Sequence, residues 1–281
     1  MNMKSIIRKI ALQIISQPKN KVSVEISSIN YGGILKNQRI VVTGGSTGIG
    51  YSMAKKFVSE GASVIITGRN IENLKKAAEA LGPSVKFIQF DNSDISGIEN
   101  FINDCGCIDS LILNAGVSFH EGNFLNVFED GYDKQFDINL KANYFLAQAF
   151  LKSKLQNKEQ GNLLFLSSET AGKCIDIPYG LTKVAINSLV GGLARRVYEK
   201  GIRVNAIAPG VTYTNMTKGT KKITDDYANN SVAGRYLLPE EIAEVACFII
   251  SKASKSITGD VIYCDAGSHL KINGTESEYS F

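Results

Sequence analysis

Tyr179 and Lys183 are the residues of this 281-residue chain whose types and spacing point most clearly to chemistry. They stand four positions apart at the start of a predicted helix over residues 178–200, so their side chains share one face of it. A tyrosine hydroxyl can protonate a carbonyl oxygen during hydride transfer, but its ordinary pKa of about 10 is poorly matched to neutral pH. A nearby ammonium group favours the phenolate, so we expect Lys183 to lower the pKa of Tyr179. An isolated pair of this spacing is also common on ordinary helix faces.

A glycine-rich turn over residues 43–50 is the second candidate for chemistry. It stands between a predicted strand and a predicted helix, where backbone N–H groups and a helix N-terminus can meet a phosphate. The spacing is G-x-x-x-G-x-G and differs from the common G-x-G-x-x-G dinucleotide fingerprint. The turn therefore predicts a nucleotide phosphate site, with a purely structural turn as the alternative.

Alternating strands and helices provide the frame that must position these residues. Strands are predicted over residues 40–43, 64–67, 85–90, 108–113, 163–166, 203–208 and 261–264, and helices over 48–59, 72–81, 129–157, 178–200 and 240–250. The strands are near-continuous apolar runs, which is typical of strands buried on both faces. The pattern predicts an α/β fold: a Rossmann-type doubly wound parallel sheet of about seven strands with helices on both faces.

The two ends of the chain differ in character from this frame. We divide the chain into an N-terminal extension over residues 1–35, a Rossmann-fold domain over residues 36–268 and a polar C-terminal tail over residues 269–281. Basic and apolar residues alternate over residues 1–15 and predict a short amphipathic helix. That helix could pack on the domain, on a partner subunit or at a membrane surface, and we favour the domain. We find no signal peptide and no apolar run of membrane-spanning length.

Five motifs occur in the order and spacing of the short-chain dehydrogenase/reductase family. They are Thr43–Gly50 as T-G-x-x-x-G-x-G, Asn114-Ala115-Gly116 after the fourth strand, Asn139 in the long helix, Tyr179 and Lys183 as Y-x-x-x-K, and Pro209-Gly210 after the sixth strand. Over about residues 36–268 the chain resembles this family, including its 3-oxoacyl-(acyl-carrier-protein) reductase-like members.

The resemblance implies a nicotinamide cofactor and a set of residues that hold it. The expected cofactor-binding residues are Gly44, Ser46, Thr47, Gly48, Ile49, Gly50, Arg69, Asp91, Asn92, Asn114, Ala115, Gly116, Tyr179, Lys183, Pro209, Thr212 and Thr214. Among them, Lys183 would also hold the nicotinamide ribose, and Thr214 with the backbone of Thr212 would bind the carboxamide. Asp91 and Asn92 would meet the adenine ring, although an Asx turn explains this pair nearly as well.

The resemblance also implies a catalytic set of Asn139, Ser168, Tyr179 and Lys183. Ser168 would donate a hydrogen bond to the substrate oxygen. It precedes Tyr179 by only eleven residues, a shorter interval than in most relatives, so the loop looks shortened and Ser167 stays open as an alternative. Asn139 would kink its helix and hold a water that links Lys183 to solvent. Strand-ending serines and an ordinary polar helix position are the plain alternatives.

Arg69 bears on which nicotinamide cofactor is used. NAD is usually held by an acidic residue at the end of the second strand, and none stands there. The guanidinium of Arg69 could instead pair with a 2′-phosphate, which favours NADP(H) over NAD(H). Thr47 weakens this slightly, because many NADP-using relatives carry a second basic residue at that position. A solvated surface arginine is the alternative.

These observations predict an NADP(H)-dependent oxidoreductase that reduces a ketone or 3-oxoacyl group, with a small-molecule substrate that is possibly carrier-bound. The alternatives are an NAD-dependent dehydrogenase of a secondary alcohol on a sugar or steroid-like ring, and a non-catalytic nucleotide-binding scaffold. A net charge of +4 gives no reason to expect nucleic acid, and five scattered cysteines predict no metal site. Reduced thiols favour a cytoplasmic location. The family implies a homodimer or homotetramer, and the long loop over residues 211–238 is expected to cover the substrate.

Overall fold

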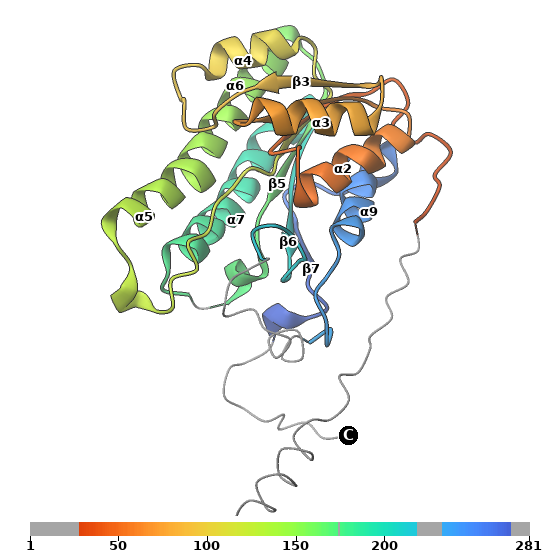
Figure 1. The fold of residues 1–281 in the computed structure, drawn as a ribbon. Helices are drawn as coiled ribbons and strands as arrows, with labels where there is room; N and C mark the ends of the chain where they lie inside the picture. Colours follow the sequence, from red (N-terminus) through yellow and green to blue (C-terminus); the bar gives the residue numbers. More distant parts are fainter. Residues whose placement is uncertain (1–27, 174, 218–231, 271–281) are drawn as a thin grey trace, which may run out of the picture.

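The structure is a computed structural model that describes residues 28–173, 175–217 and 232–270 (Figure 1). Four features expected from the sequence lie outside the described residues: the amphipathic helix over residues 1–15, Cys174, the loop over residues 218–231 and the tail over residues 271–281.

Seven parallel strands form one sheet in the order β3-β2-β1-β4-β5-β6-β7. Their bounds are β1 Arg39–Thr43, β2 Ser63–Gly68, β3 Val85–Gln89, β4 Ser110–Leu113, β5 Gly161–Leu166, β6 Ile202–Pro209 and β7 Val261–Cys264. The strand order reverses between β1 and β4, which are hydrogen-bonded neighbours. This topology confirms the predicted Rossmann-type doubly wound sheet.

Helices cover both faces of the sheet (Figure 1). One face carries α2 Gly48–Ser59, α3 Ile71–Leu81 and α9 Pro239–Ile250, and the other carries α4 Ile98–Cys105, α6 Ala142–Asn157 and α7 Pro178–Val197. Side chains alternate along each strand: Val42 of β1 belongs to the core under α2, and its neighbour Val41 to the core under α6. Both faces are buried, which explains why the strands are apolar throughout.

Two helical segments differ from the prediction. The helix α4 was not predicted, although Ile98, Phe101, Ile102 and Cys105 bury one helical face at the expected spacing. The single helix expected over residues 129–157 is wrong in its middle: α5 Glu129–Gln135 and α6 are joined by a π-helix, η2 Phe136–Lys141. Apolar periodicity does not distinguish a π-turn from the α-helix around it.

Short 3-10 helices occupy several connections. They are η1 Phe124–Asn126, η3 Glu169–Gly172, η4 Tyr198–Lys200, η5 Lys252–Ser254 and η6 Ser268–Leu270. The η4 turn extends α7 to the residue at which the sequence predicted its end, and Gly201 follows it with φ 71°.

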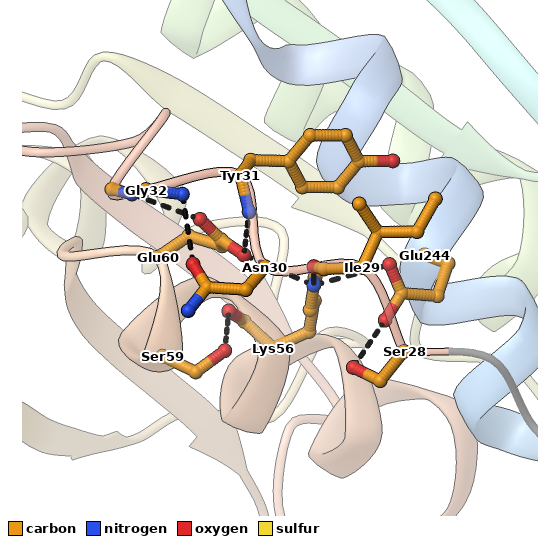
Figure 2. A network of polar contacts seen from close by, with 10 residues as sticks. Ser28, Ile29, Asn30, Tyr31, Gly32, Lys56, Ser59, Glu60 and Glu244 are labelled. Atoms are coloured by element: carbon orange, nitrogen blue, oxygen red, sulfur yellow. Dashed lines mark hydrogen bonds and ion pairs between the residues drawn. The ribbon is translucent and has the colours of Figure 1, made fainter.

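Residues 28–35 pack against α2 and α9 through a buried charged cluster, which Figure 2 shows. Lys56 lies 3.1 Å from the carboxylates of both Glu60 and Glu244 and donates to the carbonyl of Ile29. Glu60 accepts from the backbone N–H groups of Tyr31 and Gly33, at 3.1 Å each. The segment then enters the core, because the adjoining Leu35 is fully buried. This part of the predicted extension is therefore bound to the domain.

Candidate active site

A cavity of about 1040 Å³ opens at the C-terminal ends of the strands. It lies where the strand order reverses, the place where open α/β sheets bind their ligands. The residues predicted from the sequence gather around it: Gly44, Ser46, Thr47, Gly48, Ile49, Arg69, Asp91, Asn92, Asn114, Ala115, Gly116, Ser168, Tyr179, Lys183, Pro209, Thr212 and Thr214 all line it. Gly50 and Asn139 lie directly behind this lining.

The glycine turn is locked to the strand beside it. A Cβ atom on Gly50 would lie 2.4 Å from the carbonyl oxygen of Gly44 and 2.5 Å from Nδ2 of Asn114, so only glycine fits. Asn114 Nδ2 donates to the carbonyl of Thr43 at 2.8 Å, and Thr43 Oγ1 accepts from the backbone of Asn114 and Ala115. These bonds fix the turn and the loop after β4 as one rigid floor.

The turn fits a phosphate group. Thr47 is the N-cap residue of α2 but makes no side-chain capping bond, and the first turn of α2 contains no acidic residue. The N–H groups at this helix end are therefore available to an anion. Gly48, at φ 56°, brings the backbone close to the Thr214 methyl group, which would lie 3.3 Å from a Cβ there. The loop after β6 thus closes over the turn.

The ends of β2 and β3 form the far end of the cavity. Arg69 is exposed on its rim, and Ser46 Oγ lies beside Gly68, 3.8 Å from where a Cβ would stand. Asn92 is only 6% exposed, and its Nδ2 has no hydrogen-bond partner among the described residues. A buried amide donor that lines a cavity needs a partner, and a purine ring nitrogen would supply one. The residues present therefore fit an adenine nucleotide.

Tyr179 lies in the first turn of α7, which Pro178 opens at the position that suits proline. Its ring is partly exposed to the cavity, and its side chain is hydrogen-bonded to Ser168. Ser167 points away and donates to Asn187 Oδ1 at 2.5 Å. Of the two serines, the structure therefore places Ser168 beside Tyr179.

Lys183 lies one turn further along α7 and is 3% exposed. Its Nζ donates to the carbonyl of Leu166 at 2.7 Å and stands 5.5 Å from the centre of the Tyr179 ring. Burial lowers the pKa of Lys183 to about 8. Among the described residues it forms no ion pair, so no carboxylate offsets this effect.

The pKa of Tyr179 is raised, contrary to the expectation that Lys183 would lower it. Burial is the main cause, and the negative charge of Glu169 adds to it, against the hydrogen bond with Ser168, which lowers the pKa. The ammonium group of Lys183 stands over the aromatic ring and bonds to Leu166, which explains why it does not favour the phenolate. In this structure Tyr179 is a protonated group at neutral pH.

Asn139 is fully buried in the π-helix η2, so it is not a solvated helix position. Its amide clamps the loop after β4: Nδ2 donates to the carbonyl of Val117, and Oδ1 accepts from the backbone of Val117, both at 2.8 Å. A Cβ on Gly116 would lie 3.1 Å from Asn139 Oδ1 and 3.8 Å from Lys183 Nζ. The backbone carbonyl of Asn139 accepts from Asn143 Nδ2 at 2.8 Å. The clamp holds one wall of the cavity beside Lys183.

The loop between Ser168 and Tyr179 is short and tightly packed. A Cβ on Gly180 would lie 2.4 Å from Cγ1 of Ile175, and one on Gly172 would lie 3.0 Å from the Tyr263 hydroxyl. On the opposite side of the cavity, His120 Nε2 lies 3.1 Å from the carbonyl of Met216. The loops after β4 and β6 therefore meet over the cavity.

Sequence reasoning missed several residues of the substrate side. Val117, Ser118, Glu121, Glu169, Thr170, Ile177 and Met216 all line the cavity. Glu169 carried the clearest signal, because a charged residue directly after an apolar strand and next to Ser168 has to be buried or face a ligand. Among the described residues, no helix is long and apolar enough to cross a membrane, and no group of three or more His, Cys, Asp or Glu side chains could hold a metal ion.

Comparisons with known proteins agree with this geometry. The family model described as enoyl-(acyl carrier protein) reductase matches residues 44–269. The 3-oxoacyl-(acyl-carrier-protein) reductase FabG of Chlamydia trachomatis serovar D is 33% identical over 246 residues, which cover 84% of this chain and 98% of the relative. The 3alpha-hydroxysteroid dehydrogenase of Mediterraneibacter gnavus is 31% identical over 253 residues, 84% of this chain and 98% of that protein.

Solved structures give the same result. The 3-ketoacyl-(acyl-carrier-protein) reductase from Brucella melitensis complexed with NADH matches with a TM-score of 0.76 and 25% identity, over 84% of this chain and 99% of that chain. A putative NAD(P)-dependent gluconate 5-dehydrogenase from Beutenbergia cavernae with bound NADP matches with a TM-score of 0.78 and 26% identity, over 85% and 100% of the two chains.

Proposed function

The chain belongs to the short-chain dehydrogenase/reductase family, and on this premise we propose that it reduces a ketone or 3-oxoacyl group to a secondary alcohol with NADPH. The protein is an oxidoreductase that acts on CH–OH or C=O groups with a nicotinamide cofactor. The observation that carries the proposal is the hydrogen-bonded pair of Ser168 and Tyr179, in a cavity whose other end is the glycine turn.

Each residue of the pair has a distinct task in this reaction. When bound, the reduced nicotinamide supplies the hydride that is added to the carbonyl carbon. Ser168 donates a hydrogen bond to the carbonyl oxygen, and Tyr179 transfers its proton to that oxygen as the alcohol forms. Lys183 and the clamp made by Asn139 hold the cofactor side of the cavity. The raised pKa of Tyr179 supports reduction, since the tyrosine is then the proton donor at neutral pH.

The substitution Tyr179→Phe tests this mechanism. A panel of ketones and 3-oxoacyl thioesters is screened by the loss of reduced-nicotinamide absorbance, and the best substrate is then used for the variant. We expect kcat to fall about 10³-fold, because the proton donor is removed while the ring and its packing stay. Full turnover by the variant would exclude Tyr179 as the donor. NADPH binding without reduction of any carbonyl would support a non-catalytic scaffold.

Arg69 supports NADPH over NADH, and the comparisons do not decide between them, because the neighbours hold both cofactors. Its guanidinium is exposed on the rim of the cavity beside Ser46, where a 2′-phosphate could pair with both side chains. We expect Arg69→Ala to weaken NADPH binding roughly 10- to 100-fold and to leave NADH binding within about threefold. Fluorescence titration of each cofactor measures both constants. Equal effects on the two cofactors would contradict the assignment.

The assembly is also part of the proposal. Tyr144, Leu181 and Val184 are between 39% and 45% exposed on α6 and α7, and such apolar side chains on two long helices suit a homodimer or homotetramer. Light scattering of the full chain would reveal a monomer if this is wrong. The cysteines Cys105, Cys107, Cys247 and Cys264 are free, which supports action in the reducing cytoplasm.

A further inference from the structure

Glu169 is a buried carboxylate that the reaction described above does not use. It follows Ser168 directly, lines the cavity and is only 6% exposed. The backbone geometry explains its position: Ser168 caps the 3-10 helix η3 by accepting from the N–H of Thr170, so the chain turns sharply and Glu169 opens that helix. A buried charge next to the reacting groups is costly unless it has a partner or a task.

Only one cation partly offsets the charge of Glu169. Lys173 Nζ lies 3.4 Å from Glu169 Oε1, but Lys173 is 27% exposed and also lies 3.4 Å from Ser268 Oγ, so water and a second partner share its charge. The Glu169 carboxylate still acts on Tyr179, whose pKa it raises after the larger effect of burial. The field of Glu169 therefore reaches the place where the substrate carbonyl has to bind.

A second cavity carboxylate, Glu121, differs in its surroundings. Glu121 Oε1 accepts from Gln135 Nε2 at 2.6 Å, and Glu121 does not belong to the charges that shift the pKa of Tyr179. The two carboxylates are a natural pair for comparison, since both line the same cavity but only Glu169 acts on the catalytic hydroxyl. The titratable residues that line the cavity are Arg69, Asp91, His120, Glu121, Glu169, Tyr179 and Lys183.

We propose that Glu169 is a specificity-determining residue that favours neutral carbonyl substrates and disfavours those with an anionic group beside the reacting carbonyl. An anion placed there would meet the carboxylate in a site that screens charge poorly. Esters, thioesters and amides of 3-oxo acids fit this requirement, whereas the free acids do not. The inference rests on the proposed reductase function and specifies its substrate class.

A matched pair of probes isolates the charge. Ethyl acetoacetate and the acetoacetate anion share the same ketone, and the ratio of their kcat/KM values (anion over ester) is measured for each variant with NADPH. We expect Glu169→Gln to raise this ratio at least about tenfold, since it removes the charge and keeps the shape. Glu169→Asp keeps the charge and should leave the ratio low. Glu121→Gln should change it by less than about threefold.

Lys173→Met supplies a change of opposite sign. Loss of the ammonium group leaves Glu169 less neutralised, so the ratio should fall. The pH profile gives a further readout: Glu169→Gln removes a charge that raises the pKa of Tyr179, so the alkaline limb of ketone reduction should move to lower pH. A merely structural role for Glu169 would not move this limb.

The outcomes separate the two proposals. Turnover of both probes with the same ratio in wild type and Glu169→Gln would overturn the role of Glu169 and leave the reductase function intact. If neither probe is turned over, the reductase function fails for this class. The same ratio is then taken from dissociation constants of the two probes for the protein–NADPH complex, and an unchanged ratio overturns the inference there as well.

Discussion

Lys56 and Lys183 are both buried lysines on helices of one domain, but their ammonium groups meet opposite surroundings. Lys56 is 7% exposed and pairs with Glu60 and Glu244. Burial alone would lower its pKa, but its hydrogen bonds to these two carboxylates raise it. Lys183 is 3% exposed and bonds to one carbonyl, and burial lowers its pKa to about 8. Paired charge fastens the N-terminal segment, and unpaired charge is kept where chemistry needs it.

Lys183→Met should break the comparison on the catalytic side with the largest effect. We expect kcat/KM to fall about 10³-fold or more, because both the cation near Tyr179 and the expected ribose contact are lost. The free energy of unfolding should not decrease, since a buried ammonium without a carboxylate partner costs energy. Turnover of the best ketone and urea denaturation measure the two quantities. A large loss of stability would show that Lys183 is structural, like Lys56.

Lys56→Met should give the reverse pattern. Removal of the ammonium leaves Glu60 and Glu244 buried without their partner, so the free energy of unfolding should fall by roughly 3–5 kcal/mol. The kcat of the folded fraction should stay within about threefold, because the cluster is not part of the cavity lining. Urea denaturation of the full chain, followed by circular dichroism, checks the stability. Unchanged stability would contradict the anchoring role.

Alkaline pH should separate the two lysines next. The folded-state pKa of Lys183 is about 8 against about 10.5 for the ordinary group, so between these values the unfolded chain binds more protons. Stability of the wild type relative to Lys183→Met should therefore rise with pH in this window, by up to about 3 kcal/mol. Lys56, whose pKa is raised, should contribute no such change there. A flat difference between wild type and Lys183→Met would exclude the depressed pKa.

Acid pH should give the smallest effect, through Glu60. Burial would raise the pKa of this carboxyl, but hydrogen bonds from Tyr31, Lys56 and Gly33 outweigh it and lower the pKa. Its contribution to stability is thus present above the ordinary pKa of glutamate and is lost as the pH falls through the lower folded value. The wild type should lose more unfolding free energy between pH 7 and pH 3 than Glu60→Gln does. Parallel curves would contradict this.

Much of the fold follows from the sequence, since each strand is a short apolar run that periodicity and turn residues delimit. The helix α4 shows a limit of attention more than of physics, because Ile98, Phe101, Ile102 and Cys105 carry the full amphipathic pattern. The π-turn η2 is different. It inserts a residue into the helical ladder without any change in polarity, so spacing alone does not reveal it.

The site was partly predictable for a related reason. Motif order predicted which residues line the cavity, but not their electrostatics: the raised pKa of Tyr179 depends on burial and on Glu169, which only the three-dimensional packing reveals. The choice between Ser167 and Ser168 likewise depended on where the strand ends and which neighbour each hydroxyl meets. Their catalytic roles stay proposals for the experiments above.

The contact between Gly180 and Ile175 also constrains how this enzyme can diverge. Because a methyl group at residue 180 would collide with Ile175, the side chain at this helix position and the length of the preceding loop must change together. A descendant that first gained a larger residue 180 would displace the loop that shapes the substrate pocket. One that first lengthened the loop would be free to replace the glycine later. Insertion should therefore precede substitution in any lineage that acquires a wider pocket.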